Sequence, residues 1–153
     1  MDSLPTQIQL EVVSPERELV HESVLSVSIP AKNGYLGILP GHAPLLAELG
    51  ENELSYRANG RTNYAAVFGG YVEVLAGRVI LLAEAAERAE EIDAARAMAA
   101  KSAAEKTLAT PHTPDAEAAA ARRALARAEL RLKVAARAPG SAAGKSAPAA
   151  HSA

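Results

Sequence analysis

Between residues 6 and 83, short stretches of alternating polar and apolar residues are separated by turn-forming residues. Residues 7–12 alternate as a half-buried strand does, and residues 26–29 repeat the pattern just before Pro30. Leu54, Tyr56 and Ala58 share one face of a strand that ends at Asn59-Gly60, a strong hairpin signal because both turn residues need positive φ angles. Further strands are expected over residues 64–68, 71–75 and 78–83, with Gly69-Gly70 separating the first two. Turn signals this closely spaced predict a sandwich or barrel.

At residue 84 the pattern changes to that of a helix. Residues 84–109 are rich in Ala, Glu, Arg and Lys and contain no Gly or Pro. Pro111 and Pro114 end this helix, and Thr113-Pro114 reads as an N-cap followed by proline at the first position of a second helix, which runs to residue 137. The sequence therefore predicts an α+β chain, with an antiparallel β-sandwich at residues 1–83 and an antiparallel two-helix hairpin at residues 84–137. Residues 138–153, composed mainly of Ala, Gly, Ser and Pro, are expected to form a disordered tail.

The seam expected between the two helices is mostly alanine. It places Ala85, Ala89, Ile92, Ala95 and Ala99 against Ala118, Ala121, Leu125, Ala128 and Leu132. Alanine contributes far less than the ~1.5–3 kcal/mol of a fully buried leucine, so this hairpin is held weakly and is suited to reversible opening. A hairpin that simply stays closed is the alternative.

Composition narrows the functions that the chain can have. The net charge of −2 provides no basic field for nucleic acid or anionic lipid, and the absence of cysteine excludes disulfides, thiolate metal sites and cysteine nucleophiles. The four histidines are scattered without the spacing of a metal site, and no Ser/His/Asp set stands out, so we expect neither a metal nor a catalytic site. The N-terminus does not resemble a secretion signal, and the longest apolar run, residues 79–83, is far short of the ~20 residues of a membrane helix. Any contact with a membrane is therefore expected to go through a partner.

The most specific segment is residues 33–46, Asn-Gly-Tyr-Leu-Gly-Ile-Leu-Pro-Gly-His-Ala-Pro-Leu-Leu. Structural turns alone would explain its glycines and prolines, but the segment resembles the characteristic loop of the epsilon subunit of F-type ATP synthases. Residues 12–17, 69–74 and 78–83 resemble other strands of that family in the same order. The resemblance covers residues 7 to about 137.

This resemblance implies a fold and a role. Epsilon subunits are ten-stranded sandwiches with a helical hairpin, found in the central stalk of the proton-transporting ATP synthase. The resemblance implies a non-catalytic rotary subunit that couples proton flow to ATP synthesis. Its sandwich would join the gamma subunit to the membrane c-ring, and its hairpin would rise toward the alpha/beta catalytic head to inhibit ATP hydrolysis. The expected location is peripheral, on the cytoplasmic side of the plasma membrane.

By motif match, the loop from Leu36 to Leu46 lies in the rotor interface and His42 faces gamma. The interface residues implied in this way are Tyr35, Gly37, Pro40, Gly41, His42 and Pro44. The two glycines would allow close backbone approach by a partner. Many bacterial members carry an acid in place of Tyr35, so that contact with the c-ring is here aromatic or absent.

A second match lies in the helices. Residues 92–97, Ile-Asp-Ala-Ala-Arg-Ala, resemble the pattern of members that bind ATP on the hairpin, and the end of the second helix aligns Arg127 and Arg131 with phosphate-contacting positions. The implied site for a regulatory ATP, with no cofactor required, comprises Ile92, Asp93, Arg96, Ala97, Arg127 and Arg131. The alternatives are an ordinary Asp93–Arg96 ion pair and a solvated row of arginines, and Ala103 stands where such members usually have a further base. A free-standing β-sandwich adaptor with a nucleotide-sensing hairpin is the rival function.

Overall fold

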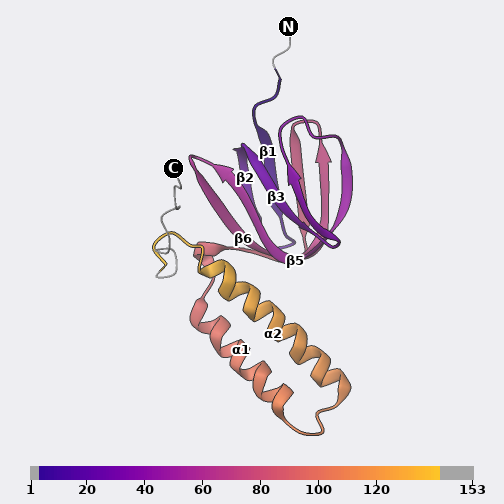
Figure 1. Ribbon diagram of the computed structural model, residues 1–153, viewed down its shortest axis with the longest axis vertical. Helices are drawn as coiled ribbons and strands as arrows, with labels where there is room; N and C mark the ends of the chain where they lie inside the picture. The colour runs from indigo at the N-terminus through magenta and orange to yellow at the C-terminus, as the bar shows by residue number, and fades with distance from the viewer. Residues whose placement is uncertain (1–3, 142–153) are drawn as a thin grey trace, which may run out of the picture. The chain divides into compact units, whose positions relative to one another are not determined.

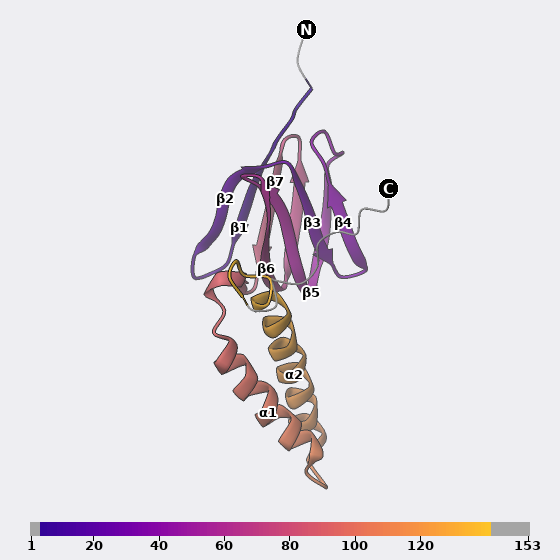
Figure 2. The same cartoon turned by 60° about the vertical axis from the view of Figure 1, so that its left-hand side comes forward.

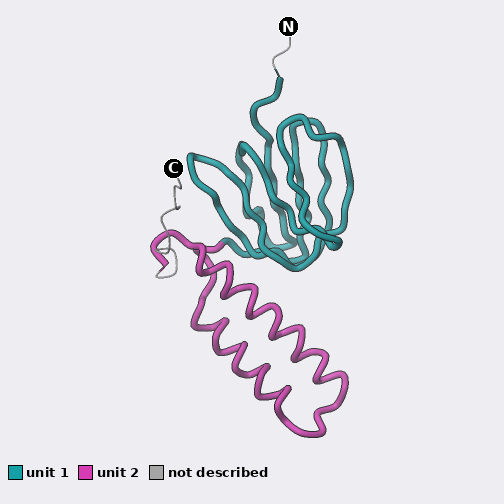
Figure 3. The backbone as a smooth tube through the Cα atoms, viewed as in Figure 1, with its two compact units in different colours: residues 1–88 teal, residues 89–153 magenta. Residues whose placement is uncertain are grey.

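The computed structural model describes residues 4–141. The chain divides into two compact units, residues 1–88 and residues 89–153, which Figure 3 colours separately. We call them the sheet unit and the helical unit. The predicted α+β fold, a β-sandwich followed by two helices, is confirmed. The division falls after Arg88, beyond the expected boundary at residue 83.

The sheet unit contains strands that hydrogen-bond in the order β2-β1-β7-β6-β5-β3-β4, with β8 paired to β6 (Figures 1 and 2). Their bounds are β1 Ile8–Val13, β2 Glu18–Val24, β3 Ser26–Ala31, β4 Gly34–Ile38, β5 Leu45–Ala58, β6 Arg61–Leu75, β7 Arg78–Ala83 and β8 Ala86–Arg88. The resemblance implied ten strands, whereas the described residues form eight, in part because β6 runs without a break through Gly69-Gly70.

Strand pairing is antiparallel with one exception. β1 pairs with β7 in parallel, with Gln9 opposite Arg78, so the expectation of a wholly antiparallel sheet was wrong at this pair. The predicted hairpin at Asn59-Gly60 is confirmed, because these residues have φ angles of 55° and 75° and join the antiparallel strands β5 and β6.

One continuous apolar cluster fills the inside of the sheet unit. Leu54, Tyr56 and Ala58 are all buried, which confirms the face expected for that strand. The largest fully buried side chains come from β1, β2, β3, β4, β5, β6 and β7, and include Phe68, Ile8, Leu10, Leu19, Ile29, Ile38, Leu54 and Leu81. The aromatic and branched residues of the first half of the chain therefore build the sheet core.

The segment after β7 is not helical, although helix formers dominate its composition. Phe68 N donates to Ala85 O at 2.9 Å and Glu84 N donates to Gly69 O at 3.1 Å, and β8 then pairs with β6. A short 3-10 turn, η1 Ala89–Glu91, precedes helix α1 at Ala94–Ala109. The helix expected from residue 84 thus begins ten residues later, at Ala94, because pairing with β6 outweighs local helix propensity.

Helices α1 and α2 (Asp115–Ala135) run antiparallel in the helical unit (Figure 1). Asp93 is the N-cap of α1, and its carboxylate accepts a hydrogen bond from Arg96 N at 3.0 Å. The expected capping of α2 by Thr113 was wrong. The Thr113 hydroxyl donates instead to the carbonyl oxygens of Thr110 and Thr107 at the end of α1, while Pro114 occupies the N-cap position of α2.

The seam between the helices differs in phase from the expected one. In α1, Ala97 and Ala104 are buried, whereas Ala95 and Ala99 are exposed. In α2 the expected Ala121 and Ala128 are buried, together with Leu130 and Val134. The seam is therefore rich in alanine, as predicted, but the first helix presents a different face.

Candidate partner interface and nucleotide site

The family-like loop begins on β4, the strand at one end of the sheet order. After β4 the chain turns at Leu39-Pro40-Gly41-His42, where His42 N donates to Leu39 O at 3.1 Å. Proline at the second position and Gly41 at the third, with a φ of +87°, match a type II turn. The sequence therefore holds the loop in a fixed shape beside an edge strand.

The His42 ring is oriented by its neighbour. Its Nδ1 lies 2.7 Å from the Ala43 carbonyl oxygen. Because a carbonyl oxygen only accepts, Nδ1 must carry the proton, so Nε2 of the neutral ring is a hydrogen-bond acceptor. His42 is half-buried, and Gly41 and Pro44 on either side are exposed. The loop thus presents a rigid turn with a histidine acceptor.

Tyr35 lies on β4 with 51 % of its surface exposed. Partial burial raises the pKa of its hydroxyl above the usual value, and the Glu53 carboxylate adds to the rise. The side chain at this position is therefore a neutral aromatic donor at pH 7.

The two interface glycines differ in what the fold demands of them. Gly41 needs its positive φ for the turn, so this glycine has a structural explanation. Gly37 has no positive φ, and a Cβ added there would find nothing within 4 Å. A close partner approach therefore remains a specific explanation only for Gly37.

An apolar surface lies near this loop, and of its residues the sequence pointed only to Leu46, at the end of the segment from Leu36 to Leu46. Leu46, Tyr71 and Leu82 are 73 %, 57 % and 57 % exposed. Tyr71 pairs directly with Leu82 across β6 and β7, and Leu46 lies diagonally across β5, opposite Glu73. We call these three residues the apolar patch. In the sequence, this apolar surface is indicated by the unbroken apolar run of residues 79–83, which places apolar side chains on both faces of its strand.

A groove of about 400 Å³ lies beside the apolar patch. Tyr71 and Leu82 line it together with Val13 and Pro15, which come from β1 and the turn that follows it. The groove enlarges the apolar area that a partner could cover. Exposed apolar surface of this kind marks interaction sites more often than chance, since soluble proteins keep such patches small.

The nucleotide set is divided between the two helices. Asp93 and Arg96 stand at the start of α1, whereas Arg127 and Arg131 lie one turn apart in the second half of α2. Because the helices are antiparallel, the start of α1 lies beside the second half of α2, and Lys101 Nζ approaches Glu129 Oε1 to 4.0 Å across the seam. Arg127 and Arg131 are half-buried, as is Ile92, while Ala97 is buried. The register of this contact leaves Asp93 nearer the end of α2 than Arg127 is, so the set is spread along the hairpin, and Asp93 already serves as a helix cap.

A small cluster on the sheet unit contains residue types that bind metals. Glu11, Glu18 and His21 bring one ligand atom each within 4.8 Å of one another. Both carboxylates already have protein partners, because Arg78 Nη2 lies 2.6 Å from Glu11 Oε2 and His21 Nδ1 lies 2.9 Å from Glu18 Oε1. The cluster is a surface network across β1, β2 and β7, made of the Arg78–Glu11 ion pair and the His21–Glu18 hydrogen bond.

Models of known families match nearly all the described residues. Residues 7–89 match the β-sandwich domain of the ATP synthase delta/epsilon chain, and residues 83–136 match the long α-helix domain of the same chain. The chain belongs to the ATP synthase delta/epsilon family. The resemblance seen in residues 33–46 is thereby confirmed.

Similar proteins agree with this assignment. The ATP synthase epsilon chain of Solibacter usitatus is 48 % identical over 132 residues, which cover 86 % of this chain and 98 % of the relative. The epsilon chain of Koribacter versatilis is 53 % identical over 102 residues, covering 67 % and 72 % of the two chains. These relatives are subunits of an enzyme complex.

Solved structures show the same fold. A chain of the Euglena gracilis mitochondrial ATP synthase, in a structure of OSCP, F1 and c-ring, matches with a TM-score of 0.74 and 26 % identity over 88 % of this chain and 84 % of that one. A chain of the Tetrahymena thermophila mitochondrial ATP synthase, in a structure of the central stalk and c-ring, gives 0.56 at 16 % identity over 82 % and 94 % and supports the fold alone. Neither helix of the described residues is long and apolar enough to span a membrane.

Proposed function

We propose that this chain is a non-catalytic rotor subunit of a proton-translocating F-type ATP synthase. Its sheet unit links the gamma subunit to the c-ring, and its hairpin restrains ATP hydrolysis by reaching toward the alpha/beta head. The reaction itself belongs to the assembled complex. The subunit is peripheral on the cytoplasmic side of the plasma membrane and meets the membrane only through its partners.

The apolar patch carries this proposal. Leu46, Tyr71 and Leu82 are each more than half exposed on adjacent strands. The solvent-facing positions of an antiparallel sheet are usually occupied by polar side chains. Leu46 is the second residue of β5, so the patch adjoins the loop ending at Pro44 that the family resemblance assigns to the rotor. Patch, groove and loop together offer the apolar centre with polar surroundings that is typical of protein interfaces.

Co-purification from solubilised membranes tests this function. The full chain should retain the gamma subunit and the c-ring in a stable complex, which a free-standing adaptor would not. Leu82→Glu introduces a charge into the patch and should reduce recovery of partner subunits at least tenfold. Met98→Glu is the matched control, because Met98 is similarly exposed, at 61 %, but lies on α1.

The outcome decides between the rotor subunit and the adaptor. Recovery of the chain without gamma or c-ring would refute the rotor function. Equal recovery with Leu82→Glu and Met98→Glu would refute the patch as the contact surface. Urea unfolding of both variants confirms that an altered recovery does not reflect a misfolded sheet unit.

Regulation by ATP is a second proposal for the hairpin. It is supported by the family resemblance of residues 92–97 and by Arg127 and Arg131 lying in the half of α2 that runs beside the first part of α1. Two guanidinium groups one helical turn apart can hold phosphate oxygens through charge-assisted hydrogen bonds, and a ligand that touches both helices stabilises the closed hairpin. No cofactor is needed for the rotor function itself.

A further inference from the structure

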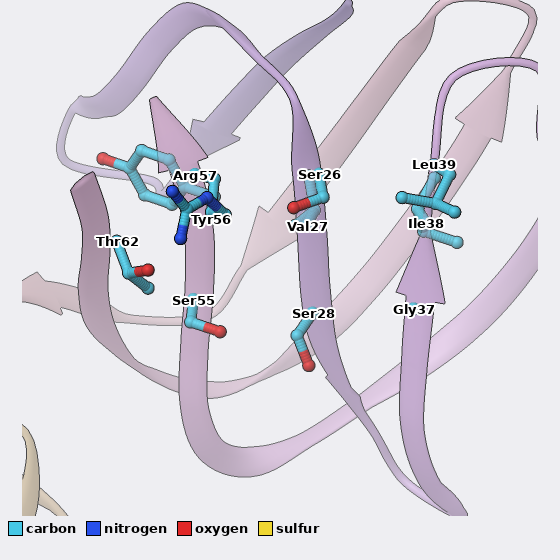
Figure 4. Close-up of a pocket in the computed structure, with 10 residues that line it drawn as sticks. All are labelled: Ser26, Val27, Ser28, Gly37, Ile38, Leu39, Ser55, Tyr56, Arg57 and Thr62. Atoms are coloured by element: carbon cyan, nitrogen blue, oxygen red, sulfur yellow. The ribbon is translucent and has the colours of Figure 1, made fainter. Parts of the chain in front are cut away.

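A second groove crosses the outer face of β4, β3, β5 and the start of β6 (Figure 4). Its volume of about 310 Å³ is enough for a small ligand, because small-molecule sites typically have volumes of ~300–1,000 Å³. Hydroxyl and guanidinium groups line it, from Ser26, Ser28, Ser55, Arg57 and Thr62. We call these five residues the hydroxyl groove.

Strand pairing places Arg57 between two hydroxyl groups. Arg57 on β5 stands directly opposite Ser26 on β3 and Thr62 on β6. Neighbouring strands lie ~4.8 Å apart, so both hydroxyls are within reach of a ligand that is held by the guanidinium. In Figure 4 the hydroxyl groups of Ser26 and Thr62 are directed toward Arg57. The pairing therefore brings three hydrogen-bond donors from three strands to one point.

The hydroxyl groups of this groove have unused hydrogen-bonding capacity. Among the described residues, none of these half-buried side chains makes a hydrogen bond to another residue: Ser26, Ser28, Ser55 and Thr62. Elsewhere in the sheet unit, Ser14 Oγ donates to Arg17 O and Ser23 Oγ donates to Gln9 Oε1. Each hydroxyl of the groove can therefore donate a hydrogen bond to a ligand without breaking one within the sheet unit.

Arg57 gives the hydroxyl groove its charge. Its guanidinium forms no hydrogen bond or ion pair with the other described residues, whereas Arg78 on β7 pairs with Glu11 at 2.6 Å. None of the 10 residues that line the groove is Asp or Glu. The charge that complements this groove is therefore negative.

The arrangement of the donors favours a phosphate group over a carboxylate. A carboxylate has two oxygens, and a guanidinium group binds both of them in its own plane. A phosphate group has at least three strong acceptor oxygens in a tetrahedral arrangement. It can accept from Arg57 and also, through its other oxygens, from the hydroxyl group on either side. The single cation of the groove matches one phosphate group.

We propose that the hydroxyl groove binds the phosphate group of a small ligand, either inorganic phosphate or a phosphate monoester. The guanidinium of Arg57 holds two phosphate oxygens, and Ser26 and Thr62 donate to the others. The rest of an ester lies over Ser28, beside Gly37, which has no side chain to obstruct it. This site is separate from the arginines of the hairpin and does not depend on the rotor function.

Nuclear magnetic resonance of the full-length chain tests the site. Backbone amides are followed while sodium phosphate is added at constant ionic strength, with sodium chloride as the reference, and glycerol phosphate and acetate are titrated in parallel. Arg57→Ala should weaken phosphate binding at least tenfold, and Arg57→Lys should weaken it less because it keeps the charge. Thr62→Val should weaken it about threefold. Arg61→Ala is the matched control, since it removes an arginine of the same hairpin outside the groove.

Saturable shifts of the Ser26, Arg57 and Thr62 amides that are lost in Arg57→Ala and kept in Arg61→Ala support the proposal. Tighter binding of glycerol phosphate then identifies the ester as the ligand, and equal or weaker binding identifies free phosphate. Shifts no larger than those with chloride or acetate overturn it, as do shifts confined to the helices or unchanged in Arg57→Ala. The same spectra report whether Arg57→Ala is folded, and if it is not, Arg57→Lys and Thr62→Val decide. Co-purification tests the rotor function separately, so the two proposals can fail independently.

Discussion

Gly70 is the position at which the fold most strongly requires glycine. It pairs with Ala83 on β7 and has a φ of +119°. In Gly70→Ala, the new Cβ would lie 2.0 Å from the Leu82 carbonyl oxygen and 2.9 Å from Ala83 Cα. These are backbone atoms, so β6 and β7 must separate by roughly 1 Å before the contact becomes tolerable.

The expected loss of stability follows from two terms. The unfavourable φ costs about 1–3 kcal/mol, and one or two weakened ladder hydrogen bonds cost about 1 kcal/mol each. Gly70→Ala should therefore lower the free energy of unfolding by about 2–5 kcal/mol, a large share of the ~5–15 kcal/mol of a typical domain. Gly77→Ala is the control, because Gly77 has a φ of +73° but its Cβ would meet nothing within 4 Å. It should lose only about 1–2 kcal/mol.

Urea unfolding followed by tyrosine fluorescence provides the measurement. The four tyrosines all lie in the sheet unit, so their signal reports on that unit and not on the helices. The comparison isolates the backbone clash, since both variants carry a strained alanine. If Gly70→Ala and Gly77→Ala lose the same free energy within about 1 kcal/mol, the clash with β7 is relieved at no cost and the reasoning is wrong.

Two further predictions concern the helical unit. A chain ending at Arg88 keeps β8, so it should fold and join the complex, and the complex should then hydrolyse ATP faster than with the full-length subunit. A chain ending at Ala83 lacks β8 and should melt at a lower temperature. Equal hydrolysis rates with the full-length and Arg88-ended subunits would refute inhibition by the hairpin. ATP should bind the isolated subunit with a Kd in the roughly millimolar range. Arg127→Ala and Arg131→Ala should each abolish saturable binding, whereas Arg122→Ala, at an exposed position of α2, should not. The absence of a heat change at about 10 mM ATP would contradict a nucleotide site.

The sequence was sufficient to predict those elements whose structure is determined by their own local residue pattern. Asn59-Gly60 forms its turn because positive φ angles are intrinsic to these residues, and Leu54, Tyr56 and Ala58 are buried because alternation places them on one face. Sequence alone could not reveal β8, because its state depends on pairing with residues 65–67 of β6. The composition of residues 84–91 favours a helix, and only the distant partner strand reverses that preference.

The candidate site also contains both residues that the sequence predicts and residues that it does not. Residues 35–46 were found because their order resembles a family, whereas Tyr71 and Leu82 were missed because their neighbourhood exists only after β6 and β7 pair. The seam in α1 was misplaced for another reason. Where almost every position is alanine, hydrophobic periodicity has little contrast, so the sequence does not distinguish Ala95 from the buried Ala97.

The two units differ in how tightly they are packed, which favours a sheet unit of fixed conformation and a helical unit whose conformation can change. The sheet unit buries large side chains such as Phe68 and Leu54, each worth about 1.5–3 kcal/mol, whereas α1 buries only Ala97 and Ala104 among its described residues. Each alanine contributes one methyl group, about 0.8 kcal/mol. A ligand at ten times its Kd adds about 1.4 kcal/mol to the state it binds, which is negligible against the sheet core but comparable with the alanine contacts of α1. The composition of this chain therefore favours the hairpin as the place of any conformational change and leaves the fold of the sheet unit unaffected by it.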